Sequence, residues 1–277
     1  MFNENKAMKT LEELKTDNAV FSIGQALSDG WTMVSRHLGY YILGGIISIA
    51  ISGSVSIIPL VGSFVNGVIL SPCLMAGAVY VTWNISKGKG WTDFGNMFKG
   101  FNYLQPMAIS TLIQGLATLI LTVLVFYNFL PELTNLVKIS QGTDVFLRQE
   151  EIKIAAIQLF KGKFIVSCLI LTVSLLFISA LWAFKNHFIV IYKMEAWPAM
   201  EMSRRIARHN LWKLIGLFVV LGIIIIISAI PCGIGLLFSL PMMIGATYSA
   251  FAQITGCDQA GEINERMFDF MGEEKKD

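Results

Sequence analysis

Long stretches without a charged residue divide this chain. There are four, with lengths of 49, 32, 21 and 44 residues: Leu38–Ser86, Gly100–Pro131, Phe164–Phe184 and Leu214–Cys257. A helix needs about 20 apolar residues to cross the hydrocarbon core of a bilayer. The runs therefore have room for two, one, one and two crossings, and we expect six transmembrane helices.

Prolines divide the two longest runs. Pro59 and Pro231 each remove a backbone donor and crowd the preceding turn, which favours a tight turn between antiparallel helices. The pattern predicts an all-α, polytopic membrane protein. Its expected spans are Leu38–Ile58, Val61–Trp83, Leu104–Leu130, Phe164–Val190, Leu214–Ile230 and Ile234–Ile254.

Composition and charge support this class and predict an orientation. Hydrophobic residues make up 55% of the chain, charged residues only 14%, and the mean hydropathy is +0.63, far from the values of a soluble domain. Sixteen of the 21 Lys and Arg residues fall on one side of the predicted topology, and the other five lie in Glu132–Lys163. Because basic residues are retained in the cytoplasm, both termini are expected there. The polar segment Met1–Asn18 has no apolar core of a cleavable signal, so the first span is expected to direct insertion.

The first and last pairs of spans resemble each other. A shift of 172 residues places Arg36 on Arg208, His37 on His209, Gly44 on Gly216 and Pro59 on Pro231. After the proline turn the shift falls to 169 and 168, which pairs Pro72 with Pro241, Gly77 with Gly245 and Tyr80 with Tyr248. Four spans separate the two starts, so the copies point the same way and predict two parallel internal repeats.

The repeat suggests how the chain is divided. We expect a polar N-terminal segment over 1–19, a helical membrane domain over 20–256 and a cytoplasmic tail over 257–277. Repeat one covers about 20–103 and repeat two about 194–256, with the central spans and an outer segment in 104–193. Within that outer segment, a helix capped by Thr143 is expected, lying over the bundle as a lid or resting on the membrane surface.

Each repeat opens with an amphipathic segment. In the first, Ile23, Leu27, Trp31 and Val34 share one helical stripe, and Ser22 is placed to cap it. In the second, a basic face carries Arg204, Arg205 and Arg208. We expect both as interfacial helices on the cytoplasmic side, either recognising lipids or a partner or simply anchoring the span that follows.

Few polar residues lie at membrane depth. Lys185 and His187, in "ALWAFKNHFIVIY", are the main candidates, and Lys185 either snorkels to the interface or faces a polar interior. Asn66 is another polar candidate, although interhelical hydrogen bonding also explains it. Pro72 and Pro241 interrupt corresponding spans and mark either kinks or a substrate site.

The remaining residues indicate no chemistry of catalysis. The sequence lacks the common zinc-protease, serine-hydrolase and nucleotide-binding motifs, and no span contains a carboxylate. The four cysteines have no ligand-like spacing, so we expect no metal, no cofactor, no nucleic-acid partner and no enzyme. The favoured function is association with membrane lipids, a membrane-protein partner or a second copy of the chain. The alternative is a transporter or channel for a small solute, with its site between the two repeats.

Two stretches resemble a known family. "IPLVGSFVNGVILSPCLMAGAVYVTWNISKGKGWTDFGNMFKGF" and "YKMEAWPAMEMSRRIARHNLWKLIGLFVVLG" resemble an uncharacterised bacterial family of multi-spanning integral membrane proteins. They are also similar to the membrane domain of some glycerophosphodiester phosphodiesterases. No phosphodiesterase domain accompanies them here. The resemblance therefore implies a helical domain of the bacterial cytoplasmic (inner) membrane, without that activity.

Overall fold

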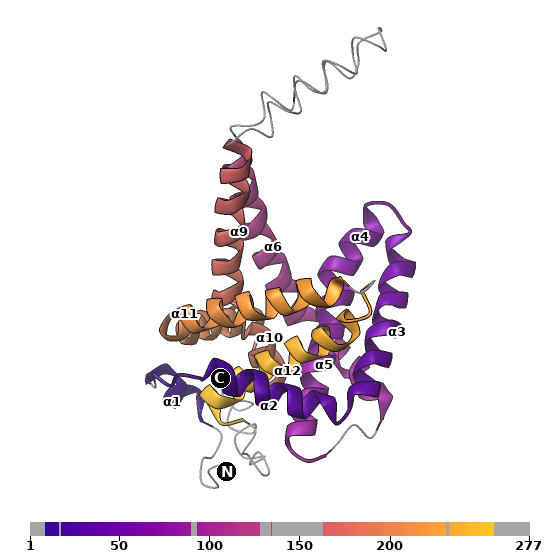
Figure 1. Ribbon diagram of the computed structural model, residues 1–277, viewed down its shortest axis with the longest axis vertical. Helices are drawn as coiled ribbons and strands as arrows, with labels where there is room; N and C mark the ends of the chain where they lie inside the picture. The colour runs from indigo at the N-terminus through magenta and orange to yellow at the C-terminus, as the bar shows by residue number, and fades with distance from the viewer. Residues whose placement is uncertain are drawn as a thin grey trace, which may run out of the picture. The chain divides into compact units, whose positions relative to one another are not determined.

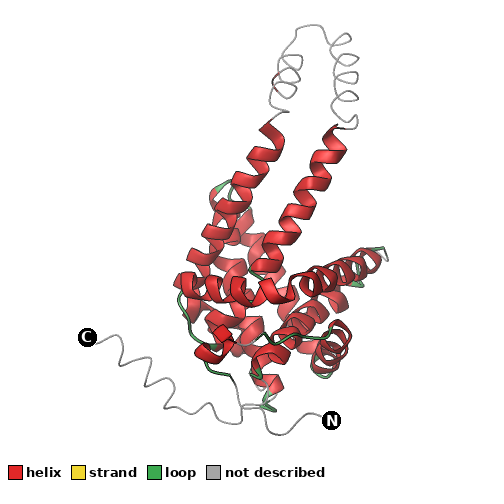
Figure 2. Cartoon of the chain, turned by 90° about the vertical axis from the view of Figure 1, so that its left-hand side faces the viewer, coloured by secondary structure: helices red, strands yellow, loops and turns green. Residues whose placement is uncertain are grey.

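The computed structural model describes residues 9–16, 18–89, 93–127, 134, 163–230 and 233–257. All regular structure among these residues is helical (Figures 1 and 2), and six helical segments are long and apolar enough to cross a membrane. The predicted all-α class and the six spans are therefore confirmed.

The first hairpin turns at the predicted proline. Helix α3 (Leu38–Ser56) leads into a turn around Pro59, and the chain returns through α4 (Val61–Val65), the π-helical segment η1 (Asn66–Leu70) and α5 (Ser71–Ser86). Gly62 follows the turn so closely against α3 that a Cβ there would overlap the carbonyl oxygen of Val55. A residue without a side chain is what this close approach requires.

The central pair of spans comes next. The 3-10 helix η2 (Phe94–Tyr103) begins where the Asp93 carboxylate accepts a hydrogen bond from Gly95 N, and α6 (Leu104–Phe126) follows without a break. The return consists of α9 (Lys163–Leu181) and α10 (Lys185–Ile191). Residues 112–179 form a compact unit of their own, closed by a ring contact between Phe126 and Phe164. The predicted end of the third span at Leu130 and the helix expected after Thr143 lie outside the described residues.

The last hairpin differs from the prediction. An interfacial helix followed by a separate span was expected, but α11 (Ala196–Ala229) is one continuous α-helix of 34 residues. In the first repeat, α2 (Ile23–Ser35) does end before α3, with His37 outside helical geometry. By the repeat shift, the helix-disfavouring Gly39 corresponds to Leu211, a good helix former, which explains why only the first copy breaks. The return helix is α12 (Leu236–Thr255), and Pro231 lies outside the described residues.

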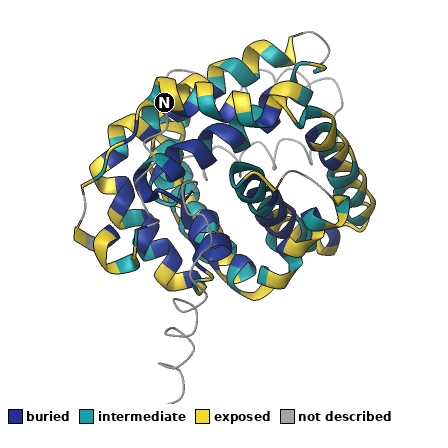
Figure 3. Ribbon diagram, turned by 90° about the horizontal axis from the view of Figure 1, so that it is seen from below, coloured by how far each residue is buried: buried dark blue, intermediate teal, exposed yellow. Residues whose placement is uncertain are grey.

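Three short helical segments pack against the ends of three returning spans. Helix α2 packs on α12, η2 packs on α5, and the start of α11 packs on α10. The first two pairs are in backbone contact: a Cβ on Gly245 would overlap Gly30, and a Cβ on Gly100 would overlap Gly77. We call these six elements, together with α1 (Leu11–Thr16), the hub. Figure 3 shows buried residues where the helices face one another and exposed residues on their outer sides.

The N-terminal segment belongs to the hub in part. A polar segment over 1–19 was expected, yet Leu14 on α1 is fully buried in the main apolar cluster. Thr10 and Glu13 cap α1 reciprocally, because each side chain accepts a hydrogen bond from the backbone amide of the other. Residues 9–16 therefore form an ordered part of the fold.

Candidate functional site

A break in the fourth span creates the centre of the hub. The predicted span Phe164–Val190 has the expected length, but its helix is interrupted between α9 and α10. One hydroxyl bridges the interruption: Ser203 Oγ on α11 donates to Leu181 O at 3.0 Å and accepts from Phe184 N at 3.1 Å. Both open helix ends thus gain a partner from a third helix.

Lys185 is the first residue after this break and is buried. Its ammonium group donates to the carbonyl oxygen of Ser110 on α6 at 3.3 Å, and only 6% of the residue is exposed. Of the two alternatives for Lys185, the structure describes a side chain that faces the protein interior. The turn preceding α10 redirects this side chain from the span axis toward α6.

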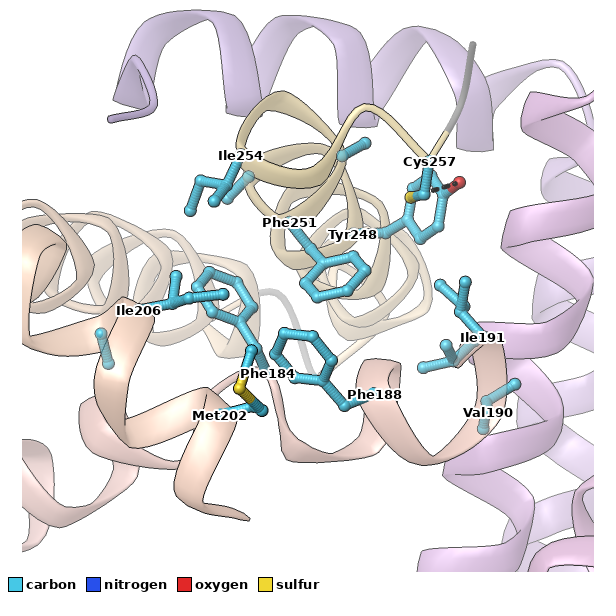
Figure 4. Close-up of a cluster of buried hydrophobic side chains, with 14 of the residues drawn as sticks. Phe184, Phe188, Val190, Ile191, Met202, Ile206, Tyr248, Phe251, Ile254 and Cys257 are labelled. Carbon is cyan, nitrogen blue, oxygen red and sulfur yellow. Dashed lines mark hydrogen bonds between the residues drawn. The ribbon is translucent and has the colours of Figure 1, made fainter. Parts of the chain in front are cut away.

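His187 lies two residues further on, among aromatic rings. Its ring stacks on Phe251 with centroids 5.0 Å apart, and the rings of Tyr248 and Phe184 lie at 6.2 and 6.1 Å. Figure 4 shows Phe251 pointing toward Phe184 and Phe188 in this cluster. Neither ring nitrogen of His187 has a hydrogen-bond partner among the described residues. Residues two positions apart on a helix do not face each other, so Lys185 and His187 do not form one binding pocket.

Asn66 lies elsewhere. Its amide nitrogen donates to Ser56 Oγ at 3.3 Å, and its amide oxygen accepts from Ser71 Oγ at 3.4 Å. The first bond joins the returning segment to the end of α3, and the second lies within the returning segment. Asn66 and Lys185 thus have separate sets of partners, and interhelical bonding accounts for Asn66.

The two intramembrane prolines are both buried but sit in different helical settings. Pro72 is the second residue of α5, which directly follows the π-helical turn of η1, whereas Pro241 lies inside the regular helix α12. A π turn uses more residues than an α turn. It therefore takes up part of the register slip between the two sequence copies, and it leaves Pro72 at a position where its missing amide is tolerated.

The three predicted arginines lie on the first half of α11. Arg204 is half-buried and forms a two-bonded ion pair with Glu201, whereas Arg205 and Arg208 are exposed. Sequence reasoning missed the exposed Trp197, one turn before Glu201. Its signal was the helical spacing that it shares with Arg205, Arg208 and Trp212.

The N-terminal segment is hydrogen-bonded to the hub through Lys9, a contact that the sequence did not suggest. Lys9 Nζ donates to Ile254 O at 2.9 Å, and Lys9 N donates to Thr255 O at 3.0 Å. The Tyr192 hydroxyl donates in turn to Lys9 O at 3.2 Å. Burial raises the pKa of Tyr192, so the phenol keeps the proton that it donates.

Six apolar helical segments and a small helical hub define a multi-pass, all-α membrane protein. A domain of unknown function, DUF7847, matches residues 112–262, and the chain belongs to this family. The match begins within α6 and continues past the end of α12, so it includes Lys185, His187 and the three arginines. Neither the curated proteins nor the solved structures contain a match. Among the described residues, no group of three His, Cys, Asp or Glu side chains is arranged to hold a metal ion.

Proposed function

We propose that this protein is not an enzyme and that it acts by associating with lipids or with another membrane protein. The observation that carries the proposal is the unequal packing of the spans. In their most apolar windows, 44% and 56% of residues are buried for the spans that end in α5 and α12, but only 11% for α3 and 17% for α11. Much of the apolar surface of α3 and α11 is thus available to something other than this chain.

Within these apolar windows, the exposed residues are mostly aliphatic. On α3 they include Ile46 and Ile49, and on α11 they include Val219, Ile223 and Ile226. Lipid tails cover such faces, because they are as apolar as these side chains, while a protein partner needs close backbone approach as well. Gly45 and Gly53 on α3 offer that approach, since a Cβ on either would have no side chain and no backbone of another element within 4 Å.

Transport of a small solute is the second candidate. The two unpartnered nitrogens of His187 favour it, because a buried imidazole without partners is costly and is often kept for function. Against it, Lys185 and Asn66 have separate partners, and aromatic rings fill the space around His187. Solute flux into liposomes that is present in wild type and absent in His187→Phe would favour transport over association.

The location belongs to the same proposal. Several basic residues lie in the hub elements or directly after them, namely Arg36, Lys87, Lys99, Arg205 and Arg208. This distribution supports a hub on the cytoplasmic side, with both termini there. A bacterial inner membrane and kinship with phosphodiesterase membrane domains follow from the resemblance of the sequence stretches, and they stay predictions.

The parallel repeat is also part of the proposal, and the packing extends it. Gly62 and Gly235 each lie against the end of the preceding helix, while Gly77 and Gly245 each lie against a short hub helix. The pair formed by α10 and the start of α11 repeats the same arrangement a third time. We therefore propose three related units, each consisting of a short helix and a hairpin, with each short helix on the returning span of the preceding unit.

The association is tested by native mass spectrometry of protein purified in mild detergent. Wild type is expected to retain lipid or a protein companion. A Gly45→Leu, Gly53→Leu variant is expected to lose a protein companion but to keep lipid, and Gly24→Leu is the matched control because a Cβ there also meets nothing. Wild-type protein that carries neither lipid nor companion would contradict the proposal.

A further inference from the structure

One exposed stripe runs the length of α11 and changes character midway. Counted at 100° per residue, Trp197, Glu201, Arg205, Arg208 and Trp212 fall within about 80° of one another. The opposite face of the same segment is buried in the hub, and its members include Ala199, Met200, Ser203, Ile206, Ala207 and Asn210. Trp197 and Trp212 are 67% and 83% exposed. The stripe is therefore an outward face of the hub.

Beyond Trp212 the same stripe becomes purely aliphatic. The half-buried Ile215 comes first, followed by Val219, Ile223, Ile226 and Ile230, which are all exposed and all within the same arc. From Trp212 to Ile230 is 18 residues, or about 27 Å of helix at 1.5 Å per residue, close to the roughly 30 Å of a hydrocarbon core. The change at Trp212 thus marks the level where the helix leaves the hydrocarbon core, the depth that tryptophan prefers.

This register places two arginines among the headgroups. Arg208 and Arg205 lie about 6 and 10 Å along the axis from Trp212, and the headgroup layer on each side of a bilayer is roughly 5–8 Å thick. Arginine side chains are long enough to cover the small remaining difference. Both guanidinium groups are therefore at the depth of lipid phosphates.

The protein neutralises the charge of the stripe only in part. The Glu201 carboxylate forms its ion pair with Arg204, and it also interacts electrostatically with Arg205 and Arg208. Neither Arg205 nor Arg208 forms an ion pair with a carboxylate in the part of the chain that the structure describes. They lie three residues apart on one face, where two planar forks can engage one phosphate or two adjacent ones.

The geometry points to a site for anionic phospholipid headgroups on α11, formed by Arg205 and Arg208 and bounded by Trp197 and Trp212. The inference rests on the proposed function, because it names the ligand class of that association. The ligand is the phosphate of an acidic lipid in the leaflet on the hub side. Its acyl chains follow the aliphatic part of the same stripe.

The test measures which lipids stay bound. Wild type, Arg205→Gln/Arg208→Gln and Arg205→Lys/Arg208→Lys are incubated in mixed micelles of phosphatidylglycerol and phosphatidylcholine and then weighed by native mass spectrometry. We expect wild type to favour phosphatidylglycerol and the Gln variant to lose about thirtyfold in that preference, from roughly 1 kcal/mol for each of the two basic residues at a membrane surface. The Lys variant is expected to fall between them, because it keeps the charge but not the fork.

Lys89→Gln is the matched control, since it removes one exposed charge elsewhere on the hub side. The inference would be overturned if Lys89→Gln lost as much of the preference for phosphatidylglycerol as the Gln variant, or if wild type had no such preference. It would also be overturned if the Gln variant lost a bound protein and not a bound lipid.

Because both arginines are exposed, unchanged thermal unfolding of the Gln variant is expected. If that variant does not fold, the comparison of wild type with the Lys variant decides, and equal affinity would overturn the role of the guanidinium fork. Retention of phosphatidylcholine by all folded variants would leave the broader association intact, so the two proposals fail separately.

Discussion

At the scale of single residues, the buried polar side chains at the centre of the hub can be tested for whether they stabilise the fold. His187 has two ring nitrogens without partners, in a setting of Phe251, Tyr248 and Phe184. Leaving a polar group unpaired costs free energy, whereas an apolar replacement of similar shape does not carry that cost. The hub therefore gains nothing in stability from an imidazole at this position.

We predict that His187→Phe leaves thermal stability in detergent unchanged or raises it, by up to about 1–2 kcal/mol in the free energy of unfolding. The measurement is thermal unfolding with retention of the monomer peak on size exclusion. A clear loss of stability would show that the imidazole has a bonded partner in the folded protein, and it would remove the support that the unpartnered nitrogens give to the transport hypothesis.

Lys185, unlike His187, is expected to stabilise the hub, because its long side chain fills buried space. Lys185→Met keeps most of the buried volume and removes the ammonium group that donates to Ser110 O, so it should cost less than about 1.5 kcal/mol. Lys185→Ala leaves a cavity and should cost about 2–4 kcal/mol. Chemical denaturation of both variants distinguishes packing from charge: equal losses in the two would contradict the packing argument.

At the scale of elements, glycines hold the hub helices together. A Cβ on Gly245 would lie 2.5 Å from Gly30 O and 2.7 Å from a methyl group of Val34. The two helices α2 and α12 must separate to make room, because backbone on both sides leaves little freedom. We predict that Gly245→Ala destabilises the protein by about 3 kcal/mol. Gly24→Ala, with open space around it, should be neutral or slightly stabilising in the same unfolding assay.

The helices that could be predicted from the sequence are those set by local hydropathy, and the features that could not be predicted depend on residues far apart in the chain. The spans, the first proline turn and the helical class follow from long uncharged runs, because burial of the backbone in lipid allows little else. The continuity of α11 was missed because amphipathicity and membrane hydropathy were read as separate segments, although Asn210 through Trp212 contain no helix breaker. The break after Leu181 was missed because its stabiliser, Ser203, lies 22 residues away.

The candidate site shows the same division. The sequence did single out Lys185, His187 and the arginines as unusual, since charge near a span is rare. It gave no sign that Lys185 meets Ser110, nor that Lys9 meets the end of α12, because such pairings depend on tertiary packing alone. For the stripe on α11, the sequence shows the helical spacing of its members, but only the structure shows that they are exposed.

At the scale of the whole molecule, the N-terminal segment joins elements from the other end of the chain. Lys9 supplies two hydrogen bonds to the last carbonyls of α12, where a positive charge is also favoured by the helix dipole. We predict that Lys9→Met increases amide hydrogen exchange in the last turn of α12 by about three- to fivefold, equivalent to somewhat less than 1 kcal/mol. Lys89→Met is the control, and equal exchange in both variants would contradict the capping role.

The contact between α2 and α12 has a consequence for how the protein is made. Gly30 and Gly245 are 215 residues apart, and at about 5–20 residues per second a ribosome needs roughly 11–43 s to synthesise the chain between them. During that interval α2 already exists, but the surface of α12 that covers Gly30 does not. The hairpins can insert into the membrane one after another, but the hub is complete only after α12 has been made. Until then, the face of α2 that carries Gly30 lacks the helix that covers it in the folded protein.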